Sequence, residues 1–71
     1  MNEHDVVRLK ETVIVIPNFE DEPIEIKAGW RGTIIAHADK PTPCIEFTNY
    51  HEIPVLVDLD AANLEVVWTV K

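Results

Sequence analysis

Few residues in this chain have the type and spacing that catalytic chemistry requires. Cys44 is the single thiol of the 71 residues, and a nucleophilic cysteine needs a neighbouring base and an electropositive setting. His37 and His51 are candidate bases. Cys44 itself lies on a short predicted strand, directly after Pro43 and before Ile45. We therefore expect a structural cysteine, buried or at a strand edge, because a free cysteine packs as a small apolar side chain.

Metal binding has little more support. The sequence places an acidic residue next to each histidine or two positions from it, as His4 with Asp5, His37 with Asp39, and His51 with Glu52. No pair of histidines has a recognised ligand spacing such as His-x-x-x-His. Two neighbouring loops could still bring these side chains together, so the question stays open for all three histidines. The expectation is surface histidines, with no metal and no cofactor.

The remaining signatures of enzymes are missing from the sequence. It contains no Ser/His/Asp arrangement, no glycine-rich phosphate loop and no inward-facing pair of carboxylates. A chain this short also has little room for a ligand pocket of roughly 300 Å³. We predict that the protein is not an enzyme.

Charge and composition narrow the class further. Thirteen acidic residues stand against six basic ones, for a formal net charge of -7, and the basic residues are scattered. Phosphate recognition needs clustered Lys and Arg, so nucleic acid is an improbable ligand. The hydrophobic fraction of 46% excludes a natively disordered chain. With no long apolar run, no signal-peptide pattern and one cysteine, residues 1–71 are expected to form one cytoplasmic domain.

The elements that must position any site are short strands. Five prolines, at positions 17, 23, 41, 43 and 54, interrupt the chain, and short β-branched segments lie between them. The segments with strand character are 5–10, 12–16, 22–27, 33–37, 44–48, 53–59 and 64–70. The second and third read as the arms of a hairpin whose tip carries Glu20, Asp21 and Glu22.

Turns and caps complete the predicted fold. Gly29 and Gly32 flank Trp30 in a tight turn, where Gly29 can take a positive φ and Gly32 allows a close approach. Asp60 can cap a single 3₁₀ turn up to Asn63. Leu64, Val66 and Trp68 share the inward parity of the last strand, so Trp68 is expected in the core. Together the segments predict an all-β protein, a small closed barrel of five to six short antiparallel strands.

Four sequence stretches then resemble a known architecture. "DVVRLKE", "IKAGWRGTII", "CIEF" and "VLVDLDAANLEVV" follow the order of an SH3-like barrel of the bacterial, KOW-like kind. The chain looks like a family of short uncharacterised bacterial proteins built as one such barrel, over about residues 5–68. The resemblance implies the fold but no ligand. The aromatic cluster that grips proline-rich peptides is missing, as are the basic residues with which KOW modules touch RNA, and one barrel hosts many functions.

The remaining candidates for function are aromatic residues at predicted loops. Phe19, Trp30 and Tyr50 are expected at or near the surface, with Glu20, Asp21 and Glu22 beside Phe19. Exposed rings make good contact anchors because they carry a large apolar area at low entropic cost. An alternative places Trp30 over the open end of the barrel. These residues predict a non-catalytic protein-binding module that acts through a protein partner, for which the acidic charge suggests a basic one, or through self-association.

Two other functions compete with the binding module. One is an antitoxin or immunity-type inhibitor that neutralises a basic enzyme, and the other is a nucleic-acid-associated module. Acidic surfaces steer association with basic partners, which favours the first of these over the second.

Overall fold

The computed structural model describes residues 1–48 and 54–69. Within these residues the chain forms short strands and one 3₁₀ turn, in the order β1 (Val6–Leu9), β2 (Val13–Val15), β3 (Ile24–Ile26), β4 (Arg31–Ala36), β5 (Cys44–Phe47), β6 (Val55–Asp58), η1 (Ala61–Asn63) and β7 (Leu64–Trp68). The predicted all-β class and the 3₁₀ turn before the last strand are confirmed. The described residues hold seven strands, because the hairpin arms add two to a five-stranded sheet.

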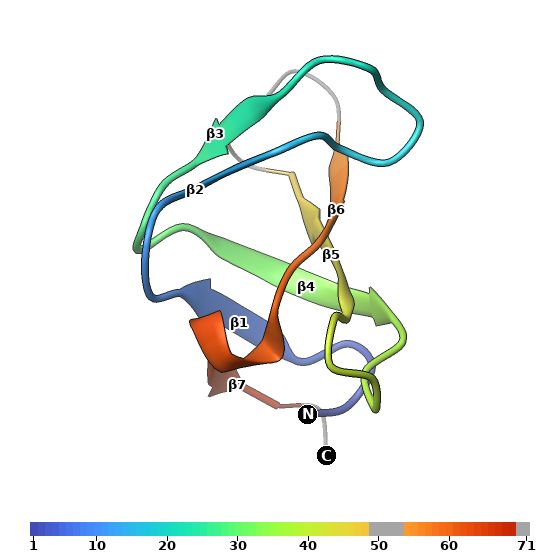
Figure 1. Ribbon diagram of the computed structural model, residues 1–71. Coiled ribbons are helices and arrows are strands. Elements are labelled where there is room, and N and C mark those ends of the chain that lie inside the picture. The colour runs from blue at the N-terminus through green and yellow to red at the C-terminus, as the bar shows by residue number, and fades with distance from the viewer. Residues whose placement is uncertain (49–53, 70–71) are drawn as a thin grey trace.

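The strands form two antiparallel sheets. The larger has the order β6-β5-β4-β1-β7, and the smaller pairs β2 with β3. In Figure 1 the hairpin of β2 and β3 lies above the larger sheet, and the turn that joins them projects away from it. No helix among the described residues is long and apolar enough to cross a membrane.

The core lies between the two sheets. The larger sheet contributes Val7, Leu9, Ile34, Ile45, Phe47 and Val57, all almost completely buried, and the hairpin contributes Ile26. Val13, Val15 and Ile24 of the hairpin pack against this cluster while remaining half-buried. The inner face of the hairpin therefore covers the larger sheet, and burial of this apolar area is the main stabilising contribution to the fold.

The turns follow the local sequence. Gly29 has φ +92°, a conformation that favours glycine, as the turn prediction required. Gly32 pairs with Val7 and faces the core, where a Cβ would come within 2.6 Å of Ile45 Cγ2. Asp60 caps η1 as predicted, since its carboxylate accepts a 2.9 Å hydrogen bond from the backbone N–H of Ala62.

The predicted core position of Trp68 is wrong, and Val66, which the same parity predicts to face inward, is 41% exposed. Leu64 pairs with Leu9 and Val66 with Val7, but Trp68 pairs with Val6 because the register shifts between Val6 and Val7. A β-bulge of this kind inserts one residue and reverses the faces of the residues that follow. Trp68 consequently shares the outer face with Val6, and its side chain is 57% exposed.

Candidate functional site

The hairpin turn carries the most exposed aromatic side chain of the described residues. Phe19 is 97% exposed. Its backbone has φ +69°, the left-handed region that bulky residues seldom enter. Such strain persists only where the surroundings impose it, and it is common at functional sites. The predicted surface position of Phe19 agrees with this geometry.

Asn18 fixes the turn to the larger sheet. Its backbone N–H donates to the carbonyl of Leu56 in β6 at 2.8 Å. Its side-chain amide lies 3.5 Å from Asp58 Oδ1 and 3.7 Å from Cys44 Sγ. Pro17, just before it, is buried. The segment that precedes Phe19 is therefore held in place, and the ring is presented on an anchored turn.

Three carboxylates follow the ring. Glu20, Asp21 and Glu22 are all exposed, and the turn is closed by a 3.2 Å hydrogen bond from the N–H of Glu20 to the carbonyl of Pro17. None of the three carboxylates has an ion-pair partner in residues 1–48 and 54–69. Their charge faces solvent beside an uncovered aromatic ring.

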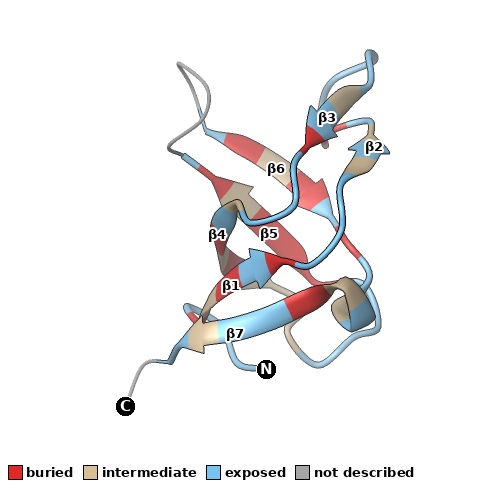
Figure 2. Ribbon diagram, turned by 90° about the vertical axis from the view of Figure 1, so that its left-hand side faces the viewer, coloured by how far each residue is buried: buried red, intermediate tan, exposed pale blue. Residues whose placement is uncertain are grey.

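Two further apolar side chains lie on the outer face of the hairpin. Ile14 is 73% exposed and Ile16 is 58% exposed. In Figure 2 the strands β2 and β3 are mostly tan and pale blue, the colours of intermediate and exposed residues. Sequence reasoning treated 12–16 as one apolar run and did not select these residues. The sequence does contain a signal, since the acidic Glu25 lies between the two isoleucines of β3. Glu25 pairs with Ile14, so the face of the hairpin that these two residues share is the solvated one.

The structure separates the other predicted aromatic residues from this turn. Trp30 is half-buried, packs against the core and lies with its ring centroid 6.4 Å from that of Phe47, at an interplanar angle of 57°. It follows β3 at the base of the hairpin, where its N–H donates to the carbonyl of Lys27 and its carbonyl accepts from the N–H of Leu9. Tyr50 lies outside the described residues.

Cys44 is buried, as expected for a structural thiol. Burial raises the pKa of Cys44 above its ordinary value, and the nearby charge of Asp58 raises the pKa further. A raised pKa opposes formation of the thiolate that a nucleophile needs. Among the described residues, the side-chain amide of Asn18 bonds to the thiol of Cys44 and to the carboxylate of Asp58. His51, one of the two candidate bases, lies outside the described residues.

The candidate metal ligands are dispersed. His4, His37 and Asp39 are exposed, and Asp5 is buried in a hydrogen-bonded position at the start of β1. His51 and Glu52 lie outside the described residues. In the part of the chain that the structure describes, no three His, Cys, Asp or Glu side chains gather as they would around a metal ion.

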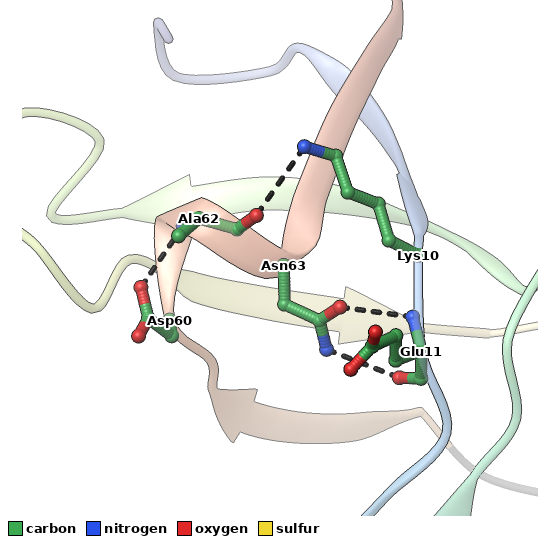
Figure 3. A pocket seen from close by; sticks show the side chains of 5 residues that line it. All are labelled: Lys10, Glu11, Asp60, Ala62 and Asn63. Carbon is green, nitrogen blue, oxygen red and sulfur yellow. Dashed lines mark hydrogen bonds between the residues drawn. The ribbon is translucent and has the colours of Figure 1, made fainter.

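A shallow depression of about 270 Å³ lies beside η1, lined by Lys10, Glu11, Asp60, Ala62 and Asn63. Figure 3 shows that its polar groups bond to one another. The amide of Asn63 accepts from the N–H of Glu11 at 2.9 Å and donates to its carbonyl at 3.0 Å, and Lys10 Nζ donates to the carbonyl of Ala62. These bonds tie η1 to the end of β1, so the depression has a structural role.

The described residues thus define a small all-β protein. Its three most exposed large apolar side chains among these residues, Phe19, Ile14 and Ile16, are on the hairpin and its turn, whereas Met1, Val66 and Trp68 are exposed elsewhere. Comparisons with known protein families, with curated proteins and with solved structures give no significant match. The resemblance to SH3-like barrels stays a prediction.

Proposed function

We propose that this chain is a non-catalytic protein-binding module of the cytoplasm, and that the β2–β3 hairpin is its contact surface. The observation that carries the proposal is Phe19, which is 97% exposed in a left-handed conformation on a turn anchored by Asn18. Exposing a phenylalanine in a strained conformation costs stability, and contact with a partner is the use that offsets such a cost. Ile14 in β2 and Ile16 directly after it add further exposed apolar area.

The charge around the hairpin favours a basic partner. Glu20, Asp21 and Glu22 follow Phe19 directly, and all three are exposed. An apolar centre with a charged rim is the common anatomy of protein interfaces, and complementary charge raises the rate of association. The same observation supports a second candidate function, an inhibitor of a basic enzyme.

A capture experiment with the tagged full chain tests the proposal. Proteins retained by the wild type are compared with those retained by Phe19→Ala and by the control Trp68→Ala, which removes an exposed ring elsewhere. We expect at least one protein to be retained by wild type and control and reduced at least tenfold by Phe19→Ala. Equal retention by all three, with the fold intact by circular dichroism, would contradict the proposal.

A salt titration separates the two candidates. An inhibitor that depends on charge should lose affinity steeply between low and high ionic strength, because screening weakens exposed charge pairs. A module that binds mainly through Phe19, Ile14 and Ile16 should keep its affinity. Inhibition of the captured protein's own activity by the purified chain would identify the inhibitor directly.

A further inference from the structure

The edges of the two sheets are not equally protected. In the part of the chain that the structure describes, β6 and β7 are the edges of the larger sheet, and β2 and β3 each have one outer edge. Edge strands present unpaired backbone groups, and proteins protect them with charges, prolines or bulges. The strands β3, β6 and β7 each contain a charged residue, Glu25, Asp58 and Glu65 respectively. The strand β2, Val13–Val15, contains neither a charge nor a proline.

Among the described residues, β2 pairs only with β3, so its other edge has no partner strand. In the view of Figure 2, β2 lies on the side of β3 away from β6, and the chain returns to β6 only after β2, where the N–H of Asn18 bonds to Leu56. In an antiparallel pair, every second residue of a strand directs its N–H and C=O away from its partner. Ile14 within β2 and Ile16 just after it are largely exposed. Both the edge and the outer face of β2 are therefore accessible to another chain.

The charge around this edge selects what can pair with it. Residues 11–26 contain five acidic residues, Glu11, Glu20, Asp21, Glu22 and Glu25, and no Lys or Arg. Glu11 lies before the start of β2 and the acidic turn follows its end, whereas the strand itself is apolar. A second copy of the chain would bring the same negative charge to the edge, and like charges oppose association.

We infer that the free edge of β2 binds an extended segment of a basic protein by strand addition. The inference rests on the proposed function and names the chemistry of its partner and the mode of binding. Residues 12–16 offer an edge of about 17 Å at about 3.3 Å per residue. The segment that fits is about five residues long, apolar and β-branched at its centre, with Lys or Arg at both ends. Main-chain hydrogen bonds supply affinity in this mode, and the flanking charges supply selectivity.

A defined peptide tests the inference on the full chain. The probe is Lys-Lys-Val-Thr-Val-Lys-Lys, with two controls: the same peptide with Glu in place of Lys, and one N-methylated at its three central residues. Hydrogen exchange is followed by NMR. We expect the probe to slow exchange of amide protons in 12–16 at least tenfold, and both controls to bind at least tenfold more weakly. Equal binding by either control overturns the inference.

Variants of the chain provide matched controls. Ile14→Lys places a charge on the free edge at an exposed position and should weaken probe binding at least tenfold. Val66→Lys does the same on the edge strand β7 and should change binding less than twofold. A probe that binds equally to Ile14→Lys, or that protects only the Phe19 turn, overturns strand addition. Exchange in 12–16 that slows with protein concentration alone would make a second copy the occupant and also overturns it.

The experiments distinguish failure of strand addition from failure of the proposed function. If Phe19→Ala abolishes capture of a partner but the probe protects no amide of β2, the binding module stands and strand addition is wrong. If the probe protects β2 but capture is independent of Phe19, the edge binds extended chains without the turn, and the proposed contact surface is wrong.

Discussion

The hydroxyl of Thr69 donates a 2.5 Å hydrogen bond to the carboxylate of Asp5, which is 2% exposed. The same carboxylate accepts from the backbone N–H of Asn2 at 2.9 Å. The bond from Thr69 joins the start of β1 to the segment after β7, between residues 64 positions apart in the sequence. A buried carboxylate is tolerated only when its oxygens accept hydrogen bonds. The carboxylate of Asp5 meets this condition and links the start of β1 to the segment after β7.

Removing the carboxylate of Asp5 should destabilise the fold. Asp5→Ala leaves the donors of Asn2 and Thr69 without their acceptor, and we expect a loss of about 2 kcal/mol in the free energy of unfolding. Thr69→Val removes one donor and should cost about 1 kcal/mol. Urea denaturation measures both. The control Glu3→Ala, at an exposed position, should stay within about 0.5 kcal/mol of wild type.

Gly32 should tolerate no side chain. A Cβ there would lie 2.6 Å from Ile45 Cγ2 and 2.9 Å from the carbonyl oxygen of Glu46, and neither strand β5 nor the core can move freely to accommodate it. We expect Gly32→Val to lower the free energy of unfolding by more than about 1 kcal/mol, the range found for overpacked cores. Thermal denaturation gives the comparison, and a melting temperature within a degree or two of wild type would contradict the geometry.

Local signals predicted much of the fold. The alternating segments, the hairpin, the positive φ of Gly29 and the Asp60 cap each depend on a few neighbouring residues, and all are found in the structure. The face of Trp68 could not be predicted in this way, because it depends on how β7 pairs with β1 about 60 residues earlier. The bulge between Val6 and Val7 reverses the parity that the sequence alone suggests.

For the candidate site, too, only the features set by neighbouring residues could be predicted. Turn composition predicted an exposed Phe19 beside acidic residues, because both features are local. The exposure of Ile14 and Ile16 depends on the absence of a layer over a two-stranded sheet, and an apolar run cannot reveal which of its faces is covered. The half-burial of Trp30 depends on its contact with Phe47, which comes from another strand.

Because of the bulge, we expect substitutions of Leu64 and Trp68 in the last strand to cost different amounts of stability. Leu64 and Trp68 have the same parity in the sequence, but Leu64 is buried and Trp68 is on the outer face. Leu64→Ala should cost about 2 to 4 kcal/mol, because it leaves a cavity in the core. Trp68→Ala should cost less than about 1 kcal/mol. Urea denaturation of the two variants checks the difference, and similar losses would mean that Trp68 packs in the core.

The thiol of Cys44 should make stability depend on alkaline pH. Burial, and then the charge of Asp58, raises its pKa in the folded protein above the ordinary value of 9.0. Above that value the unfolded chain loses the proton first and binds fewer protons than the native state, so stability falls as pH rises through the folded pKa. Denaturation at a series of pH values above about 8 measures the slope. Cys44→Ala should reduce it, and an unchanged slope would assign it to other groups.

Replacing Phe19 should weaken partner binding without lowering the stability of the fold. Its backbone lies at φ +69°, where Asn is tolerated several-fold more readily than a bulky residue. Its ring makes almost no contact with the protein, so Phe19→Asn removes strain and little packing. We expect a free energy of unfolding equal to that of wild type or up to about 1 kcal/mol higher, together with loss of partner capture. His37→Asn, at a second exposed residue with positive φ, is the matched control and should retain capture. A large loss of stability in Phe19→Asn would show instead that the ring supports the hairpin.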